Sequence, residues 1–370
     1  MSELRRIEVT VPGGSYDILI GHGALAHLGE EVRARTAAVR CALVTDTTVE
    51  GLFAERVMSS LSVAGFDPVL FTVPAGETSK SWDRAGRLLE GFSEAGLGRD
   101  SVVVALGGGV VGDLAGFAAA TYLRGVPVVQ VPTTLLAQSD SAIGGKTGID
   151  LPRGKNLVGA FWQPILVLSD TSCLSVLPET EWRSGLAEVV KSAALFGEHA
   201  FTELWGNAEG LRTRDADAVQ RAVVMAASLK ARVVSGDERE AADRECLNYG
   251  HTLAHALERE LGYGTITHGA AVADGMRFAA RLAESVLGAP AEWERRQETL
   301  LDNLGLTRSV SACDAEGLLA AMKSDKKARD GQVRFVLLRA PGSWTVTPVD
   351  DAVLIDALEQ WCRPSTGGNA

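Results

Sequence analysis

Ser101-Val-Val-Val-Ala-Leu-Gly107-Gly-Gly-Val-Val-Gly112-Asp113 is the stretch that decides the fold. Its first half is a continuous apolar run, which is typical of a strand covered on both faces of a parallel sheet. Its second half has the spacing G-x-G-x-x-G and opens a helical pattern. Glycines in such a turn let the backbone approach a pyrophosphate, and the helix N-terminus adds N–H donors. The stretch predicts a βα unit that can hold a nucleotide, with a tight turn that binds no ligand as the alternative.

Further strands of the same kind extend this unit over the first half of the chain. They alternate with helical patterns, as in a βα-type sheet, and begin at Ala42, Pro68, Val126 and Ile165. From Glu179 onward, long helical periods rich in Ala, Leu, Glu and Arg replace them. We therefore predict an α/β N-terminal domain with a Rossmann-like parallel sheet over residues 1–178. A mainly α-helical C-terminal domain is predicted over residues 179–370.

Composition excludes several classes of protein. The chain has 370 residues, enough for two domains, and its 46% hydrophobic and 22% charged residues are typical of a soluble globular protein. The formal net charge of −11 argues against a nucleic-acid partner bound through its phosphates. No stretch reaches the ~18 apolar residues of a membrane span. We expect a protein that binds neither nucleic acid nor membrane.

The cysteines and the N-terminus indicate the compartment. The five cysteines are scattered, odd in number and free of any CxxC pair; they are Cys41, Cys173, Cys246, Cys313 and Cys362. This usage predicts reduced thiols. The first residues carry charges where a signal peptide needs an apolar run. We therefore expect a cytoplasmic protein.

A histidine-rich stretch in the second half predicts a metal site. Asn248-Tyr-Gly-His251-Thr-Leu-Ala-His255 runs on to His268-Gly269, so half of the six histidines lie close together. His251 and His255 are four apart in a helical pattern and can share a face. A further ligand must come from elsewhere. Ordinary core or surface histidines are the alternative.

The best further ligand is Glu188, in Gly185-Leu-Ala-Glu188-Val-Val-Lys191. Glu188 and Lys191 are three apart and share a face of another apolar helix. Two imidazoles and one carboxylate leave a coordination position open, which is typical of catalytic rather than structural zinc.

Two glycine-lysine elements predict an anion site in the first half. Asp140-Ser-Ala-Ile-Gly144-Gly-Lys146-Thr-Gly148 is followed by Gly154-Lys155-Asn156, which places two ammonium groups on glycine-rich backbone. This arrangement suits a phosphate or another polyanion. Asp140 stands where a P-loop requires glycine, so the pattern excludes a nucleoside triphosphate site. A flexible surface loop is the alternative.

Other polar residues at strand ends and helix starts are weaker candidates. Asp46 ends a strand, where a carboxylate can hold an adenine ribose, and Thr133-Thr134 ends another. Pro74-Ala-Gly-Glu77-Thr-Ser-Lys80 leads into a helix, and a solvated Glu-Lys pair is the simplest interpretation. Basic and amide side chains upstream and downstream of the histidines are singly expected in solvent, but together they suit a carboxylate or phosphate. These are Lys230, Arg244, Asn248 and the stretch from Lys323 to Lys327.

Taken in order, these motifs resemble the 3-dehydroquinate synthases of the sugar phosphate cyclase superfamily over nearly the whole chain. The matching runs are Pro74-Ala-Gly-Glu77-Thr-Ser-Lys80, Gly107-Gly-Gly-Val-Val-Gly-Asp113, Tyr122-Leu-Arg124-Gly125, Pro132-Thr-Thr134, Gly144-Gly-Lys146-Thr-Gly148, Gly154-Lys155-Asn156, Gly185-Leu-Ala-Glu188-Val-Val-Lys191, Asn248-Tyr-Gly-His251-Thr-Leu-Ala-His255, His268-Gly269 and Asp325-Lys-Lys327.

The resemblance implies an NAD- and metal-dependent lyase of the shikimate pathway. Such an enzyme converts 3-deoxy-arabino-heptulosonate 7-phosphate into 3-dehydroquinate and phosphate by transient oxidation with NAD, phosphate elimination, re-reduction and intramolecular aldol closure. The resemblance implies zinc, with cobalt as an alternative, on Glu188, His251 and His268. It assigns His255 to the substrate or to the surroundings of the metal, and it implies a homodimer.

The remaining site residues follow from the same resemblance. The implied substrate contacts are Lys146, Lys155, Asn156, Lys191, Lys230, Arg244, Asn248, His255, one of Lys326 or Lys327 (of which we take Lys327), and Arg124 from a dimer partner. The implied NAD contacts are Glu77, Lys80, Gly108, Gly109, Asp113, Thr133, Thr134, Asp140, Lys146, Lys155 and the segment from Cys173, with Asp46 added from its position at a strand end.

Rival functions remain open at this point. Cyclases acting on sedoheptulose 7-phosphate or glucose 6-phosphate use substrates without a carboxylate, and retention of Lys230, Arg244 and Asn248 argues against them. The sequence does not distinguish an aminodehydroquinate synthase. An iron-type polyol dehydrogenase shares a similar plan but would reduce NAD⁺ in net turnover, and a non-enzymatic binding protein would require an accidental histidine cluster.

Overall fold

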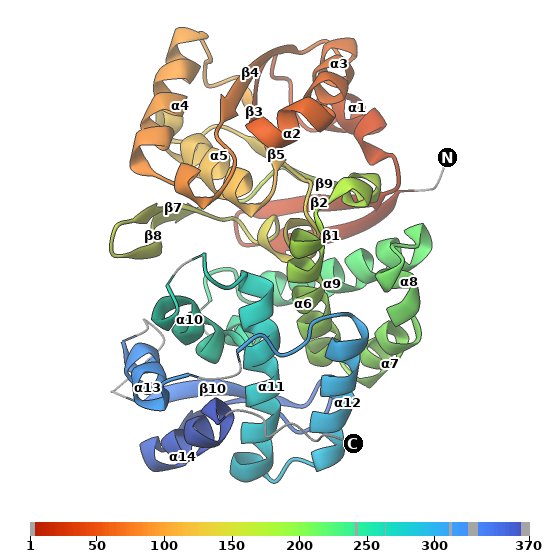
Figure 1. The fold of residues 1–370 in the computed structure, drawn as a ribbon. Coiled ribbons are helices and arrows are strands. Elements are labelled where there is room, and N and C mark those ends of the chain that lie inside the picture. Colours follow the sequence, from red (N-terminus) through yellow and green to blue (C-terminus); the bar gives the residue numbers. More distant parts are fainter. Residues whose placement is uncertain (1–3, 241–242, 263, 311–312, 325–331, 364–370) are drawn as a thin grey trace. The chain divides into compact units, whose positions relative to one another are not determined.

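The structure is a computed structural model that describes residues 4–240, 243–262, 264–310, 313–324 and 332–363 (Figure 1). The chain forms two compact units. Unit 1 comprises Met1–Pro178 and Val219–Arg239, and unit 2 comprises Glu179–Ala218 and Glu240–Ala370. One boundary between the units therefore lies after residue 178. Val219–Arg239, however, also belongs to unit 1, which the sequence patterns did not predict.

Unit 1 is built on a seven-stranded sheet in the order β1-β2-β9-β6-β5-β3-β4. The strands are β1 (Arg5–Val11), β2 (Gly14–Gly21), β3 (Arg40–Asp46), β4 (Asp67–Val73), β5 (Val102–Gly107), β6 (Val128–Pro132) and β9 (Leu166–Asp170). Only the β1–β2 pair in this sheet is antiparallel. The predicted α/β architecture is confirmed.

Helices cover both faces of this sheet, as the apolar run of β5 predicts. Val102, Val104 and Leu106 belong to one core cluster, and Val103 and Ala105 to the other. Successive side chains of a strand point to opposite faces, so a strand between two cores must be apolar throughout. The helices are α1 (Leu28–Arg33) and α3 (Glu55–Val63) on one face, and α4 (Trp82–Glu94) and α5 (Gly109–Thr121) on the other (Figure 1).

The order of the strands indicates where a ligand can bind at the edge of the sheet. From β3 the chain proceeds to β4 on one side, and then crosses to β5, β6 and β9 on the other. In open parallel sheets, ligands bind beyond the carboxyl ends of the strands where the order reverses. Here that point lies between β3 and β5, which end at Asp46 and Gly107.

A hairpin and a long helix complete unit 1. The hairpin of β7 (Lys146–Leu151) and β8 (Gly154–Phe161) packs on α5, where a Cβ on Gly116 would lie 2.4 Å from Thr147 Cγ2. Most of α9 (Ala216–Gly236) belongs to this unit. Its Ser235 Oγ accepts a hydrogen bond from the backbone of β1 at 3.0 Å, which explains why a helix far along the chain groups with the sheet.

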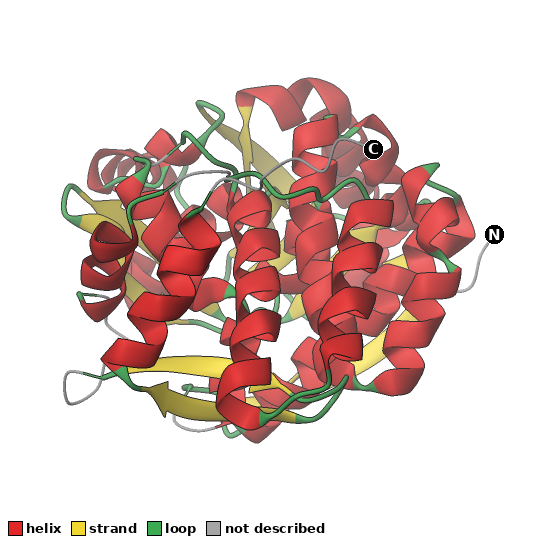
Figure 2. Ribbon diagram, turned by 60° about the horizontal axis from the view of Figure 1, so that its bottom comes forward, coloured by secondary structure: helices red, strands yellow, loops and turns green. Residues whose placement is uncertain are grey.

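Unit 2 is mainly helical, as predicted. Figure 2 draws the helices of the whole chain in red. The elements of unit 2 are α6 (Glu179–Phe196), α7 (Glu198–Gly206), α8 (Ala208–Arg212), the 3₁₀ turn η7 (Asp243–Asn248), α10 (His251–Glu260), α11 (His268–Leu287), α12 (Ala291–Asn303), α13 (Ala315–Lys323), β10 (Val333–Leu338), β11 (Trp344–Val349) and α14 (Asp351–Cys362). The central helix is α11, which packs against α6, α10, α12 and β10 (Figure 1).

The cysteines depart from the prediction. Cys313 and Cys362 form a disulfide with a Cα–Cα distance of 4.9 Å, so the expectation of five reduced thiols is wrong for these two. The sequence could not reveal this pair, because 49 residues separate its members and the packing of α14 beside α13 brings them together. Cys41, Cys173 and Cys246 are buried and do not take part in this disulfide.

Within the described ranges, no helix combines the length and the apolar character that are needed to cross a bilayer.

Candidate functional site

Three side chains of unit 2 converge to form a candidate metal centre. Glu188 lies in the middle of α6, His251 is the first residue of α10, and His268 is the first residue of α11. Glu188 Oε1 lies 3.5 Å from His251 Nε2 and 3.6 Å from His268 Nε2. One ligand atom of each residue lies within 4.8 Å of the others. The three residues predicted as ligands therefore lie together.

Close helix packing brings these ligands together. A Cβ on Gly269 would lie 2.3 Å from the Cα of Ser184, so only glycine lets the start of α11 approach α6 here. A Cβ on Gly275 would lie 1.8 Å from the carbonyl oxygen of Gly250, immediately before His251. Cβ atoms do not approach backbone atoms this closely, so each glycine fixes the position of one histidine.

The two oxygens of the Glu188 carboxylate have different surroundings. Oε2 forms an ion pair with Lys191, one turn along the same helix, and Oε1 faces the two imidazoles. Both oxygens are buried, and Oε1 accepts no hydrogen bond of ordinary geometry within the described part of the chain. Buried polar atoms normally have a partner. An oxygen facing two imidazole nitrogens without one fits a metal ligand.

Each histidine of the centre is held through its other ring nitrogen. His251 Nδ1 lies 3.1 Å from the backbone oxygen of Tyr249, and His268 Nδ1 lies 3.4 Å from Glu258 Oε1. Metal-binding histidines usually donate this second N–H to a carbonyl or carboxylate, which fixes the ring and its tautomer. The sequence patterns did not single out Glu258. Its position seven residues after His251, on the same face of α10, was the available signal.

Charges within the centre shift two pKa values in opposite directions. Burial alone would raise the pKa of Glu188, but the charge of Lys191 and the contact with His268 outweigh it and hold that pKa at about 2. Burial alone would lower the pKa of His268, but Glu188 and Glu258 raise it to about 9. In the absence of a metal, the centre is therefore a carboxylate beside a protonated imidazole.

His255 is not part of this group of three. Its ring centroid lies 5.6 Å from that of His251 in an edge-to-face arrangement, one turn further along α10. The structure therefore does not support the first interpretation of His255 as a possible metal ligand. The donor atoms that lie together belong to Glu188, His251 and His268. Its predicted role beside the metal stays a prediction.

The predicted nucleotide contacts of unit 1 lie at the carboxyl ends of its parallel strands. Gly108 joins β5 to α5, Gly109 is the first residue of α5, and Thr133 and Thr134 follow β6. A Cβ on Gly108 would lie 3.0 Å from Thr134 Cγ2, so the two strand ends are adjacent. Asp46 ends β3, where its Oδ1 accepts hydrogen bonds from Thr48 N at 2.8 Å and Val49 N at 3.0 Å.

Two further predicted NAD contacts have structural neighbours of their own. Asp140 Oδ1 lies 2.6 Å from Lys230 Nζ, so a predicted NAD contact forms an ion pair with a predicted substrate contact. Cys173 is buried in the 3₁₀ segment η6 (Thr171–Val176), and burial raises the pKa of its thiol to about 12. The thiol of Cys173 therefore stays protonated. The predicted NAD contact falls on the segment around Cys173 and not on this thiol.

Lys80 connects the predicted NAD set to the β7–β8 hairpin. Its side chain is buried, and Nζ lies 2.8 Å from Asp113 Oδ2 and 2.5 Å from Asn156 Oδ1. Its backbone oxygen accepts from Asp150 N at 2.8 Å, and Asp150 Oδ1 accepts from Asn156 N at 2.7 Å. The interpretation of Lys80 as one half of a solvated pair with Glu77 is therefore wrong. The fold of the hairpin buries the ammonium group.

We expect Lys80→Met to destabilise the protein by about 3 kcal/mol at pH 8. Burial raises the pKa of Asp113 to about 6 despite the charge of Lys80, so without Lys80 an ionised Asp113 loses its buried counter-ion. The penalty should shrink at pH 5, where Asp113 takes up a proton and no longer needs a cation. Urea unfolding at both pH values measures this.

Arg87→Met is the matched control, because the pair of Arg87 with Asp83 on α4 is exposed and should contribute less than about 1 kcal/mol. An equal loss for Lys80→Met at pH 5 and pH 8 would contradict the assignment of a buried charge pair.

The other predicted site residues differ in burial. Lys191, Lys230 and Arg244 are buried, so the interpretation of Lys230 and Arg244 as solvated charges is wrong. Arg124 is exposed. Its backbone is left-handed, with φ 68°, and that of Asn156 is left-handed as well, with φ 55°. Non-glycine residues rarely adopt this conformation, and it often marks functional segments. Lys327, with its neighbours Asp325 and Lys326, lies outside the described residues.

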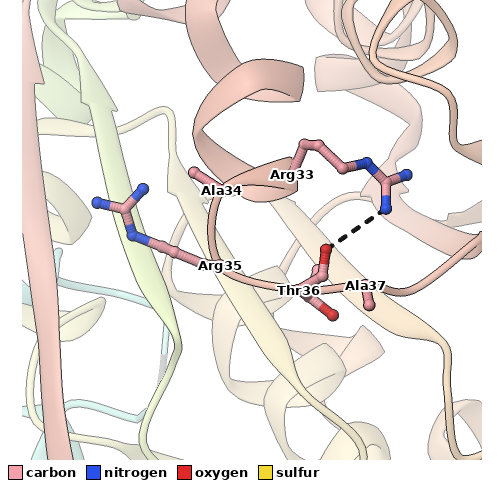
Figure 3. A pocket seen from close by; sticks show the side chains of 5 residues that line it. All are labelled: Arg33, Ala34, Arg35, Thr36 and Ala37. Atoms are coloured by element: carbon pink, nitrogen blue, oxygen red, sulfur yellow. Dashed lines mark hydrogen bonds between the residues drawn. The ribbon is translucent and has the colours of Figure 1, made fainter.

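A surface hollow elsewhere in unit 1 is lined by Arg33, Ala34, Arg35, Thr36 and Ala37 (Figure 3). Arg33 Nη1 donates to the backbone oxygens of Ala38 at 2.6 Å and Thr36 at 3.4 Å. Arg35 pairs with Asp17 at 2.5 Å and with Glu31 at 2.6 Å. Both guanidinium groups are engaged in holding the end of α1, so the hollow is not a candidate site.

Both halves of the chain match models of one protein family. Residues 70–184 match the family model described as 3-dehydroquinate synthase N-terminal, and residues 185–328 match the one described as 3-dehydroquinate synthase C-terminal. The 3-dehydroquinate synthase of Geobacter metallireducens is 47% identical over 337 residues, which is 91% of this chain and 94% of that protein.

Solved structures of sugar phosphate cyclases share the fold. A 2-deoxy-scyllo-inosose synthase complexed with carbaglucose-6-phosphate, NAD⁺ and Co²⁺ has a TM-score of 0.87 and 25% identity, covering 96% of this chain and 100% of that one. The 2-epi-5-epi-valiolone synthase of Streptomyces hygroscopicus, with NAD⁺ and Zn²⁺ bound, has a TM-score of 0.85 and 26% identity, covering 98% of each chain. The matched family models and the near-full-length relative place this chain in the 3-dehydroquinate synthase family.

Proposed function

We propose that this chain converts 3-deoxy-arabino-heptulosonate 7-phosphate into 3-dehydroquinate and inorganic phosphate, as an enzyme of the shikimate pathway. The observation that carries the proposal is the sequence identity of 47% to a 3-dehydroquinate synthase over nearly the whole chain. The identity to the cyclases of solved structure is lower, at 25% and 26%. The group of Glu188, His251 and His268 supports it, because two imidazoles and a carboxylate suit a catalytic metal with an open position.

The proposal includes NAD and a divalent metal as cofactors. Zn²⁺, or Co²⁺ in its place, would be held by Glu188, His251 and His268. NAD would be held at the carboxyl ends of the strands of unit 1, by Glu77, Lys80, Gly108, Gly109, Asp113, Thr133, Thr134, Asp140, Lys146, Lys155 and the segment from Cys173, with Asp46 near the ribose. When bound, NAD supplies a reversible hydride acceptor and the metal supplies a Lewis acid for substrate oxygens.

The chain's own residues would prepare the metal ligands. Lys191 holds Glu188 in its ionised form through Oε2 and leaves Oε1 directed at the imidazoles. The backbone oxygen of Tyr249 and the carboxylate of Glu258 hold the Nδ1 atoms of the two histidines. The ligand atoms are therefore oriented before any metal arrives, which reduces the reorganisation that metal binding requires.

Basic and amide side chains would bind the acidic substrate. In a protein of net charge −11, local cations are needed to attract a carboxylate and a phosphate. Their role would be to hold the substrate in a reactive conformation, which lowers the entropic part of the barrier. The proposed contacts are Lys146, Lys155, Asn156, Lys191, Lys230, Arg244, Asn248, His255, Lys327 and, from a dimer partner, Arg124.

The homodimer, which the family resemblance implies, and the cytoplasmic location, which is expected from the sequence, belong to the same proposal. The left-handed backbone at Leu123 and Arg124 supports a functional role for this exposed segment. Analytical ultracentrifugation of the wild-type chain tests the dimer, and mixing inactive Arg124→Ala with inactive Glu188→Gln tests the shared site. Activity that recovers on mixing supports a contribution of Arg124 across subunits.

Rates of phosphate release from a panel of sugar phosphates test the proposed substrate. The panel consists of 3-deoxy-arabino-heptulosonate 7-phosphate, its amino analogue, sedoheptulose 7-phosphate and glucose 6-phosphate, each with NAD⁺ and Zn²⁺. We expect kcat/KM to be highest for the first compound. A preference for sedoheptulose 7-phosphate or glucose 6-phosphate would assign the chain to the chemistry of its structural neighbours, and a preference for the amino analogue would assign it to secondary metabolism.

We expect zinc affinity to rise about tenfold per pH unit between pH 7 and pH 8.5. The raised pKa of His268, about 9, means that zinc must displace one proton, whereas Glu188 with a pKa of about 2 has already lost its own. Competition with a chromophoric chelator measures the affinity. The affinity for NAD over the same range is the control, and a zinc affinity that does not change with pH would contradict the protonated centre.

The stability of the metal-free protein should show the opposite trend. The pKa of His268 is raised above its ordinary value of 6.5, so this group contributes its full stabilisation below pH 6.5 and loses it as the pH rises through about 9. Zinc should remove this dependence, because the bound imidazole no longer titrates.

A further inference from the structure

The two histidines of the centre are restrained by different kinds of group. His251 Nδ1 faces a backbone oxygen, that of Tyr249, which the fold of the chain fixes. His268 Nδ1 faces a side chain, the carboxylate of Glu258 at 3.4 Å. A substitution can therefore remove the restraint on His268 while leaving that on His251 intact.

His268 needs this restraint more than His251 does. The side chain of His268 is 35% exposed, against 12% for His251, so packing alone leaves its ring more freedom. Glu258 is 7% exposed and sits in the last turns of α10, whereas His268 begins α11 after the intervening loop. A buried carboxylate is a costly feature unless charged or polar groups satisfy it. Its position beside Nδ1 gives it such a partner.

The contact favours Nε2 as the ring nitrogen that binds a metal. A neutral imidazole carries one proton, which Glu258 stabilises on Nδ1 and Glu188 stabilises on Nε2; once a cation takes the place of the proton at Nε2, Glu258 accepts the proton that stays on Nδ1. The lone pair then lies on Nε2, the atom that is 3.6 Å from Glu188 Oε1. With the proton on Nε2 instead, the ring would present a donor to the centre and could not bind a cation there.

We propose that Glu258 is a positioning residue that sets the ring orientation and tautomer of His268, and thereby the affinity of the centre for its metal. The inference rests on the proposed metal site and goes beyond it, because it assigns a role to a residue that is outside the proposed metal ligands and the proposed substrate and NAD contacts. Outer partners of this kind typically change metal affinity by about 10- to 100-fold.

Zinc titration of Glu258→Ala and Glu258→Gln tests the proposal without any measurement of turnover. We expect Glu258→Ala to weaken zinc binding by about 10- to 100-fold. We expect Glu258→Gln, which keeps an oxygen acceptor of the same size but lacks the charge, to fall between Glu258→Ala and wild type. Glu260→Gln, an exposed carboxylate at the end of α10, is the matched control and should bind zinc as wild type does.

The Nδ1–H proton of His268 provides a readout that a purely structural role would not change. In ¹H–¹⁵N spectra of the zinc-loaded protein, this proton should be protected from exchange with solvent in wild type and should exchange much faster in Glu258→Ala. If Glu258→Ala fails to fold, Glu258→Gln decides the question. Zinc affinities of both variants within threefold of wild type, with unchanged exchange of the Nδ1–H proton, would overturn the proposal. A wild-type chain that does not bind zinc at all would instead overturn the metal site itself.

Discussion

Glu188→Gln is expected to reduce turnover at least about a thousandfold while leaving NAD affinity nearly unchanged. The substitution keeps the size of the side chain but removes the negative charge that faces two imidazole nitrogens at 3.5 and 3.6 Å. It leaves two nitrogen ligands, which are too few for tight binding of zinc. NAD affinity should survive, because the residues proposed to hold NAD lie in unit 1 and Glu188 lies in unit 2.

The cost to folding has to be separated from the loss of the metal. Lys191 is 1% exposed and would lose the counter-ion with which it pairs, so some loss of stability is expected as well. Glu181→Gln, an exposed position on the same helix, is the control for the chemical change itself. Zinc titration, NAD titration and thermal unfolding of both variants separate the effects. Near-normal turnover of folded Glu188→Gln in metal-stripped buffer would contradict the metal assignment.

Gly275→Ala is expected to destabilise the protein by about 3 kcal/mol and to abolish tight zinc binding. Alanine normally favours a helix over glycine by about 1 kcal/mol, so the sign depends on the space available. Here the new Cβ would lie 1.8 Å from the carbonyl oxygen of Gly250, which is backbone and cannot rotate away. The helix α11 must move, and the start of α10, with His251, must separate from it.

Gly206→Ala is the matched control for this substitution. Gly206 ends α7 in the same unit, and a Cβ there would meet nothing within 4 Å. We expect Gly206→Ala to leave zinc binding unchanged and stability equal or slightly higher. Urea unfolding and zinc titration check both variants. If the Gly275→Ala protein were as stable as wild type, α11 could shift at no cost. That result would contradict the claim that the close packing of Gly275 on Gly250 positions His251.

The sheet of unit 1 was largely predictable because buried parallel strands are apolar throughout. The runs from Ala42, Pro68, Ser101, Val126 and Ile165 match β3, β4, β5, β6 and β9. The edge hairpin of β1 and β2 was not predicted. The placement of Val219–Arg239 with unit 1 was not predictable either, because it depends on contacts such as that of Ser235 with the backbone of Thr10, 225 residues away in sequence.

The candidate metal centre was predictable in its residue types but not in its supports. Histidine density indicated the stretch from His251 to His268, and the spacing of Glu188 and Lys191 on an apolar helix indicated Glu188. The resemblance to a family then selected His251 and His268, rather than His255, as the histidine ligands. The packing of Gly275 on Gly250 has no local signal, because glycine in a helix is equally consistent with weak packing. The burial of Lys80 was likewise hidden, since it depends on a hairpin folded against it from more than sixty residues later.

The stoichiometry of phosphate and NADH tests the central claim most directly. The protein is given 3-deoxy-arabino-heptulosonate 7-phosphate in large excess over NAD⁺, with Zn²⁺, and phosphate and absorbance at 340 nm are followed together. We predict many equivalents of phosphate per NAD⁺, no accumulation of NADH, and 3-dehydroquinate as the carbon product. NADH that accumulates in step with substrate consumption, without phosphate release, would contradict the account and indicate a dehydrogenase instead.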